Sequence, residues 1–244
     1  MGMGMGDPDG VEAGDRVSRG DVEARAVDEV RADGDRPPRY DRSATHRELT
    51  LDDIVDLRAY ERMRDDVRRR VIELKRIRRV QLGTMVSVVF ENRETVRFQV
   101  QEMARAERMM TDAQIQGELD AYNPLIPRRG ELSASLFLEM TAAEDLRVWL
   151  PRLVGIERAI ELVIGAESDT HHVMSVPEAE HEAALTRENM TASVHYIKFE
   201  LGTALVDAFA AGPIVLQSVH PEYRAATPLG EETKASLFLD LRDS

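Results

Sequence analysis

Hydrophobic positions are sparse at the start of the chain, and a regular pattern of them begins only near residue 47. Residues 1–46 contain seven of the fifteen glycines and no Leu, Ile, Phe or Trp. A segment of this composition buries too little apolar surface to offset the conformational entropy lost on ordering. We therefore predict a disordered tail over residues 1–46 and a single α+β domain over residues 47–244.

The domain is predicted to begin with a long amphipathic helix over residues 51–79. Its apolar stripe recurs every three or four residues, as one face of a helix requires: Leu57, Tyr60, Met63, Val67, Val71, Leu74 and Ile77. Thr50 and Asp53 have the spacing of a capping box, which places the first turn directly after Thr50. The same range contains ten Lys or Arg and seven Asp or Glu. This mixture favours a solvated surface over a nucleic-acid-binding one.

From residue 84 onward, short strands and helices are expected to alternate. The stretch TMVSVVF, residues 84–90, has the Val and Phe content of a strand. The next block fits either the return strand of a hairpin or a helix capped by Asn92, and the helical period persists longer. Further strands are expected at 132–140, 157–165, 192–201 and 213–219, and further helices at 112–121, 143–154, 177–188, 203–211 and 230–241. Short connections favour a mixed or antiparallel sheet of about five strands, with helices packed on it.

The strand expected at 192–201 carries a histidine on its apolar face. His195 alternates in step with Ile197, Phe199 and Leu201, whereas Tyr196 and Lys198 belong to the opposite face. His220 ends the next strand, and Glu222 and Tyr223 follow it. If the two strands are neighbours, both imidazoles and a carboxylate could hold a non-haem metal ion. The favoured alternative is that His195 is a hydrogen-bonded core residue and that His220 caps a turn.

Two further groups of polar residues are weaker candidates. The stretch THHVMSVPEAEHEAAL has metal-competent side chains, but it is more typical of a polar surface connection. The helix after residue 90 offers Asn92, Arg93, Glu102 and Arg105. The backbone N–H groups at its start could bind an anion. The favoured alternative is an exposed helix with compensating ion pairs.

Composition excludes several classes of protein. The chain has no cysteine, so it cannot form disulfides, hold an iron–sulfur cluster or use a thiol nucleophile. Its formal net charge of −13 repels nucleic acid and anionic membranes. No apolar run approaches the roughly 20 residues of a membrane-spanning helix, and the start lacks the apolar region of a signal peptide. We therefore expect a cytoplasmic protein without a membrane partner. No phosphate-binding loop, dinucleotide fingerprint or nucleophile elbow is present.

Several blocks of the sequence resemble one known family. LKRIRRVQLGTMVSVVFENRETVRFQVQEMARAERM is the longest, and ELDAYNPLIP, GELSASLFLEM, VHYIKFEL and VHPEYRA accompany it. Together they resemble a bacterial domain-of-unknown-function family, number thirty-five hundred and one, over residues 48–242. The family's activity is unassigned, and its members are often encoded beside a rubrerythrin-like protein and an iron–sulfur oxidoreductase. The resemblance thus implies a redox or oxidative-stress context and assigns no catalytic residue.

Three hypotheses follow. The first is an accessory or interaction protein of a bacterial redox module, which docks on a rubrerythrin-like or iron–sulfur partner. The second is a metal-binding protein or metal-dependent enzyme that uses His195 and His220 with a carboxylate. The third is a regulatory or nucleic-acid-binding role for the arginine-rich helix 51–79; the acidic net charge disfavours nucleic-acid binding.

Overall fold

The computed structural model describes residues 48–166, 169–179 and 190–242. The predicted tail over residues 1–46 and most of the helix expected at 177–188 lie outside these residues. The described part has an α+β fold with antiparallel sheets, which confirms the predicted class. Its helices are α2 (Leu57–Arg78), α3 (Arg93–Ala106), α4 (Asp112–Tyr122), α5 (Ala143–Arg152), α7 (Val206–Ala211) and α8 (Glu231–Arg242).

The strands described in the structure form two sheets, where the sequence indicated about five strands in one. The five-stranded sheet has the order β1-β2-β3-β7-β6: Arg79–Leu82, Val86–Glu91, Glu131–Leu138, Val194–Glu200 and Val176–Pro177. The four-stranded sheet has the order β5-β4-β8-β9: His171–Met174, Ile160–Ile164, Ile214–His220 and Tyr223–Pro228. Strands β1, β5, β6 and β9 were not expected: β1, β5 and β6 have at most four residues, and β9 keeps one face in contact with solvent.

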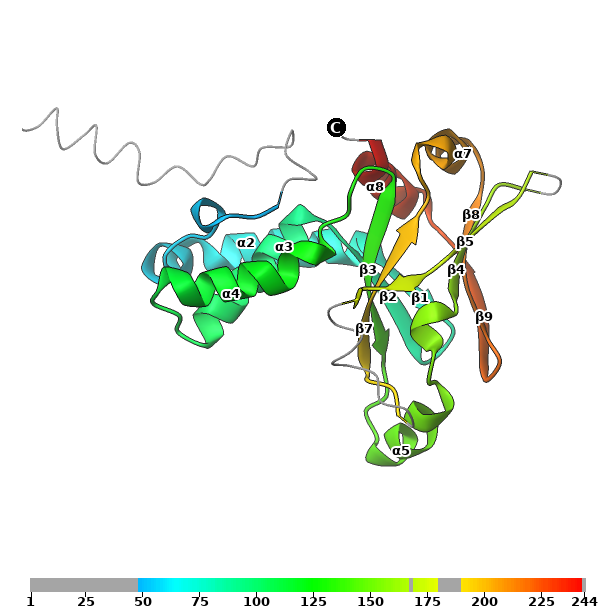
Figure 1. Cartoon of the computed structure of the whole chain (residues 1–244), viewed down its shortest axis with the longest axis horizontal. Helices are drawn as coiled ribbons and strands as arrows, with labels where there is room; N and C mark the ends of the chain where they lie inside the picture. Colours follow the sequence, from blue (N-terminus) through cyan, green and yellow to red (C-terminus); the bar gives the residue numbers. More distant parts are fainter. Residues whose placement is uncertain (1–47, 167–168, 180–189, 243–244) are drawn as a thin grey trace, which may run out of the picture. The chain divides into compact units, whose positions relative to one another are not determined.

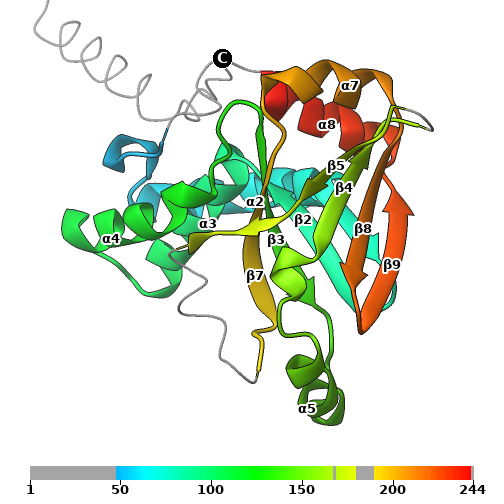
Figure 2. The same cartoon turned by 45° about the vertical axis from the view of Figure 1, so that its right-hand side comes forward.

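The main core lies between the two sheets and the helices α7 and α8. One face of the five-stranded sheet supplies Val86, Val88, Phe90, Leu132, Leu136, Ile197 and Phe199, and the four-stranded sheet supplies Ile160, Leu162, Ile164, Ile214 and Leu216. On the opposite face of the five-stranded sheet, α2 and α3 pack against β2, and α4 packs on α3 (Figures 1 and 2). The central strands β2 and β3 are therefore buried on both faces, whereas β1 and β7 keep one face exposed or half-buried.

The first helix differs from its prediction at both ends. The capping box of Thr50 and Asp53 is present, but it caps a single 3-10 turn, η2 (Leu51–Asp53). The backbone is extended at Ile54, and the Gln101 side chain binds both the N–H and the C=O of Val55, at 2.9 and 2.8 Å. These bonds satisfy the backbone outside a helix, so α2 begins only at Leu57, with Asp56 as its N-cap. At the other end, residue 79 opens β1.

The segment after β2 is the helix that the sequence favoured over a hairpin. Asn92 caps α3: its Oδ1 accepts the N–H of Thr95 at 3.0 Å, and Thr95 Oγ1 accepts the N–H of Asn92 at 2.9 Å. Two of the free N–H groups at the helix start are thereby satisfied. Helix α3 then packs against α2 and α4 over the five-stranded sheet. None of the helices in the described ranges has the length and apolar character needed to span a bilayer.

Candidate functional site

The two histidines of the predicted metal site lie on different sheets. His195 is buried on the core face of β7, and its Nε2 lies 2.7 Å from Thr191 Oγ1 and 3.0 Å from Ala192 O. His220 ends β8, where its Nε2 lies 3.1 Å from Val154 O and its Nδ1 accepts the N–H of Glu222 at 3.2 Å. The hypothesis of a shared metal site required β7 and β8 to be neighbours, but they belong to different sheets.

The other residues of that predicted site also have contacts of their own. Glu222 forms an exposed ion pair with Arg152 at 2.6 Å. The Tyr223 hydroxyl donates to Leu82 O at 2.6 Å and accepts the N–H of Met85 at 3.1 Å, which joins β9 to the β1–β2 hairpin. Within the described residues, no group of three or more His, Asp and Glu side chains is arranged to hold a metal ion. The metal site therefore stays a prediction that these contacts do not support.

The predicted residues on α3 fasten this helix to its neighbours. Asn92 is its cap, and Arg93 pairs with Asp53 of η2 at 2.6 Å. Glu102 accepts hydrogen bonds from Arg64 Nε and Nη2 at 2.9 and 2.8 Å and from the Tyr60 hydroxyl at 2.7 Å. Arg105 pairs with Glu61 of α2 at 2.6 Å. This agrees with the ion-pair alternative, although Asn92 and Arg93 are buried rather than exposed.

Tyr196 and Lys198 belong to a row of polar residues on the helix-covered face of the five-stranded sheet. Glu91 pairs with Ser133 across β2 and β3, and Ser133 pairs with Lys198 across β3 and β7. Ser135 pairs with Tyr196 in the next row. Residues directly opposite each other in neighbouring strands share a face. We call this group the polar face: Glu91, Glu131, Ser133, Ser135, Tyr196 and Lys198.

The polar face is buried, and three of its atoms lack a hydrogen bond. Glu91 is 5%, Ser133 1% and Glu131 9% exposed. No hydrogen-bond partner is present for Glu91 Oε2, Ser133 Oγ or Glu131 Oε1. An unsatisfied buried polar group costs about 1–3 kcal/mol, so native proteins keep few of them. Three such atoms on neighbouring strands leave unused hydrogen-bonding capacity on this face.

Two lysines bring positive charge to the polar face. Lys75 of α2 places its Nζ 3.6 Å from Glu91 Oε2, beyond hydrogen-bond distance. Lys198 Nζ lies 3.1 Å from Glu131 Oε1, an ion pair without the alignment of a hydrogen bond. Ser135 Oγ donates to Glu91 Oε1 at 2.7 Å, so one carboxylate oxygen of Glu91 is fixed, and the other is buried and accepts no hydrogen bond.

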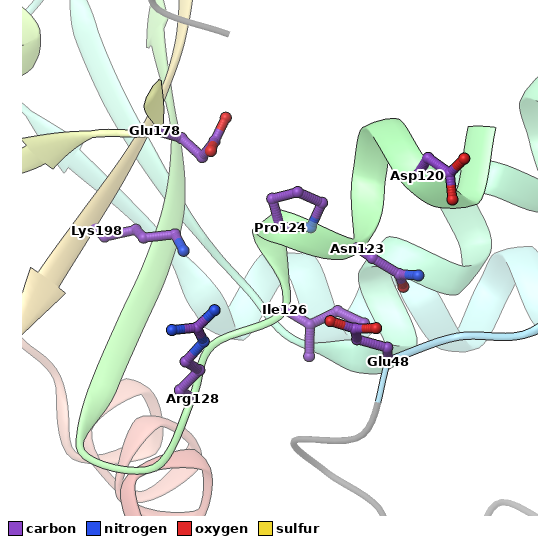
Figure 3. Close-up of a pocket in the computed structure, with 8 residues that line it drawn as sticks. All are labelled: Glu48, Asp120, Asn123, Pro124, Ile126, Arg128, Glu178 and Lys198. Carbon is purple, nitrogen blue, oxygen red and sulfur yellow. The ribbon is translucent and has the colours of Figure 1, made fainter. Parts of the chain in front are cut away.

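Cavities open at both ends of the polar face, on either side of the 3-10 turn η3 (Asn123–Leu125). One, of about 190 Å³, is lined by Lys75, Glu91, Val96, Gln99, Tyr122, Leu125, Ser135, Phe137, Val194 and Tyr196. The other, of about 430 Å³, is lined by Glu48, Asp120, Asn123, Pro124, Ile126, Arg128, Glu178 and Lys198. Figure 3 shows Lys198 and Arg128 on one side of the larger cavity and Glu48, Asn123 and Asp120 on the other.

The smaller cavity combines a neutral phenol with the charged pair. Burial, with smaller contributions from the nearby Tyr122 and Glu91, raises the pKa of Tyr196 to about 12. The Tyr196 hydroxyl therefore keeps its proton at neutral pH. Apolar side chains of Val96, Leu125 and Phe137 complete the walls. A cavity with apolar walls and a few convergent polar groups is the usual form of a small-molecule site.

Most members of this site were not among the residues selected from the sequence. Ser133 and Ser135 alternate with apolar residues along β3, a pattern typical of a solvent-facing side. Glu91 directly follows the apolar run VVF. A carboxylate next to an apolar strand segment was the signal that the sequence offered. Lys75 is one of ten basic residues in the predicted first helix, so nothing local distinguishes it.

Comparisons with known proteins identify the family and no activity. The model of the family described as "Protein of unknown function (DUF3501)" matches residues 48–241. The crystal structure of a novel protein of unknown function from Burkholderia pseudomallei K96243 has 34% sequence identity and a TM-score of 0.72, over 80% of this chain and 99% of that one. No curated protein matches. The family match covers more than half of the chain and agrees with the resemblance seen in its motifs, so the chain belongs to the DUF3501 family.

Proposed function

We propose that the protein binds a small polar molecule in the cavity of about 190 Å³ between the polar face and helices α2 and α3. The observation that carries this proposal is the carboxylate of Glu91. It is 5% exposed, it lines the cavity, and its Oε2 has no hydrogen bond. A bound molecule that donates a hydrogen bond to Oε2 removes the cost of burying that oxygen.

The surroundings of Glu91 support a binding site over a purely structural role. Ser135 fixes one carboxylate oxygen, and the buried Arg78 donates to the main-chain oxygen of Glu91 at 3.0 Å. The residue is thus held in place from two directions while its second oxygen stays available. Lys75, whose side chain is 29% exposed, places the cavity next to solvent. A ligand in this cavity therefore meets a rigidly held carboxylate close to the solvent-exposed part of Lys75.

Screening by thermal unfolding tests the proposal. A library of polar metabolites is added to the full chain, and compounds that raise Tm are tested again on Glu91→Gln. The matched control is Glu157→Gln, because Glu157 is 2% exposed and its Oε2 also lacks a hydrogen bond, but it does not line this cavity. We expect compounds that stabilise the wild type and Glu157→Gln and lose the effect in Glu91→Gln. A library without any Glu91-dependent compound would contradict the proposal.

A second proposal concerns protein partners. The accessory role in a cytoplasmic redox module, on a rubrerythrin-like or iron–sulfur partner, comes from the family resemblance, and an apolar groove of about 360 Å³ supports it. The groove lies between η2, the start of α2 and the α3–α4 connection, and its lining includes Leu51, Ile54, Met109, Met110 and Ile115. Met110 is 80% exposed. Flexible methionines in exposed apolar patches suit protein contacts.

Co-purification with those two partner classes tests the second proposal. Met110→Asp is expected to abolish association at micromolar concentrations. Ile72→Asp is the control, because Ile72 is 50% exposed and lies outside the groove. Association that survives Met110→Asp would place the contact elsewhere, and no association of the wild type would exclude the role.

A further inference from the structure

Two opposite charges lie side by side in the cavity of about 190 Å³, and each keeps hydrogen-bonding capacity. Lys75 Nζ and Glu91 Oε2 are 3.6 Å apart, which is an ion pair but not a hydrogen bond. Among the described residues, Lys75 Nζ donates no hydrogen bond and Glu91 Oε2 accepts none. The cavity therefore offers a cluster of N–H donors next to a carboxylate acceptor.

The remaining residues that line this cavity are partly apolar and partly polar. Val96, Leu125, Phe137 and Val194 are apolar, and Gln99, Ser135, Tyr122 and Tyr196 are polar. A complementary molecule carries a positive and a negative group on adjacent atoms, together with an apolar part. An α-amino acid has this arrangement, because its ammonium and carboxylate are attached to one carbon.

We infer that the ligand of this cavity is an α-amino acid with a small aliphatic side chain. Its ammonium group binds Glu91 Oε2, its carboxylate binds Lys75 Nζ, and its side chain lies against the apolar walls. The inference rests on the proposed function, since it names the ligand class of the same cavity. The volume agrees with it, because about 190 Å³ is below the roughly 300 Å³ at which cavities for drug-sized ligands begin.

Ligands with one charge fit the cavity less well. A simple amine pairs with Glu91 but brings a second cation next to Lys75. A simple carboxylate pairs with Lys75 but brings a second anion next to Glu91. At an effective dielectric constant of about 20, like charges at about 4 Å repel strongly. A zwitterion avoids both contacts and has no net charge, so the chain's charge of −13 does not oppose its approach.

Isothermal titration calorimetry with three probes tests this inference on the wild-type chain. The probes are L-leucine, 3-methylbutan-1-amine, which lacks the carboxylate, and 4-methylpentanoate, which lacks the ammonium. We expect leucine to bind, and each truncated analogue to bind about tenfold to a hundredfold more weakly, because each loses one charge-assisted hydrogen bond. If leucine and one analogue bind equally well, the charged group that the analogue lacks makes no contact in the cavity, and the inference is overturned.

Two variants assign the groups to residues. Lys75→Met is expected to remove the preference for leucine over 3-methylbutan-1-amine, and Glu91→Gln the preference for leucine over 4-methylpentanoate. Glu157→Gln, the matched buried glutamate outside the cavity, is expected to retain both preferences. The wild-type comparison of probes needs no variant, so the inference remains testable if a substitution prevents folding.

The outcomes separate this inference from the proposed function. If neither leucine nor other aliphatic amino acids bind, while a library compound binds in a Glu91-dependent way, the ligand class is wrong and the cavity is still a binding site. If nothing binds in a Glu91-dependent way, both proposals fail. If leucine binds equally well to the wild type, Lys75→Met and Glu91→Gln, it binds elsewhere and the inference is overturned.

Discussion

Arg78 at the end of α2 forms a buried ion pair with Asp240 of α8, although 162 residues separate the two in sequence. Arg78 is fully buried, and Asp240 is 3% exposed. The same guanidinium donates to the main-chain oxygens of Phe90 and Glu91, at 2.8 and 3.0 Å. The Arg78 side chain thus joins α2, the end of β2 and α8. It also fixes the main chain of Glu91, whose carboxylate belongs to the candidate site.

Arg78→Met is expected to lower the free energy of unfolding by about 3–5 kcal/mol, because it removes the guanidinium that pairs with the buried Asp240 carboxylate. Urea unfolding measures the effect. Arg76→Met is the control: Arg76 lies two residues earlier on the same helix, in exposed pairs with Glu73 and Glu232, and its loss should cost much less. Equal effects of the two substitutions would show that the buried pair adds nothing to stability.

Tyr223→Phe is expected to lower the free energy of unfolding by about 1–3 kcal/mol, because the hydroxyl bridges Leu82 O and the N–H of Met85. The Tyr223 hydroxyl leaves no room for a side chain at residue 83. Gly83 has φ +69°, and a Cβ placed there would collide with the Tyr223 hydroxyl.

Gly83→Ala is therefore expected to destabilise the wild type more than it destabilises Tyr223→Phe, where the hydroxyl is gone. The close contacts with Ala225 Cβ at 3.1 Å and with the ring carbon Cζ of residue 223 at 3.2 Å remain there, together with backbone strain of about 1–2 kcal/mol. A double-mutant cycle in urea measures the difference. Additive effects of the two substitutions would contradict the collision.

The contribution of Glu102 to stability is expected to depend on pH. Hydrogen bonds from Arg64 lower the pKa of Glu102, burial opposes this, and the bond from Tyr60 adds to the lowering. A carboxyl whose pKa is lower in the folded state stabilises the fold above its unfolded pKa, near 4.5, and loses this effect as the pH falls through the folded pKa. Glu102→Gln should therefore destabilise the protein at pH 7, and the difference from the wild type should shrink below about pH 4.

Urea unfolding of the wild type and Glu102→Gln at pH 7, 5 and 3 checks this. The exposed Glu107→Gln serves as the control for a carboxylate on the same segment. A difference between wild type and Glu102→Gln that stays constant over this range would show that the Arg64 and Tyr60 contacts do not act through the charge of Glu102.

Replacing His195 or His220 with alanine is expected to reduce stability without changing metal content. The Nε2 atom of each ring lies near a carbonyl oxygen, at 3.0 Å from Ala192 O and 3.1 Å from Val154 O. Losing such a buried bond costs about 1–3 kcal/mol. Elemental mass spectrometry on protein purified without oxygen decides the question. Near-stoichiometric iron, manganese or zinc that either substitution removes would support the metal hypothesis instead.

The strand pattern around His195 was predictable, because the alternation of β7 depends on its own residues. His195, Ile197 and Phe199 are all buried on the core face, as the period of two required. Helix α3 was predictable for the same reason, since its cap and its apolar stripe are local. The start of α2 was not predictable, because Gln101, 46 residues away, keeps Val55 extended.

The candidate site could not be derived from local patterns. Polar residues that alternate along β3 are typical of a side exposed to water, and only the packing of α2, α3 and α4 buries them. Glu91 and Lys75 lie on different elements, and their approach depends on the path of α2 across the sheet. The charge and type of these residues were visible in the sequence, but their convergence is a property of the tertiary structure.

The contact between Arg78 and Asp240 also constrains how the chain folds during synthesis. The Asp240 carboxylate and the Tyr223 hydroxyl, which meet Arg78 and Leu82, are synthesised long after those residues. While the ribosome is still producing α7 and β8, Asp240 has not been synthesised, so the guanidinium of Arg78 lacks this carboxylate. Strand β9 and helix α8, which pack on the β1–β2 hairpin and its surroundings, are also still missing. Such long-range closure slows folding and prolongs the exposure of apolar strands. The apolar strands of the nascent chain should therefore reach their final burial only after α8 has left the ribosomal exit tunnel.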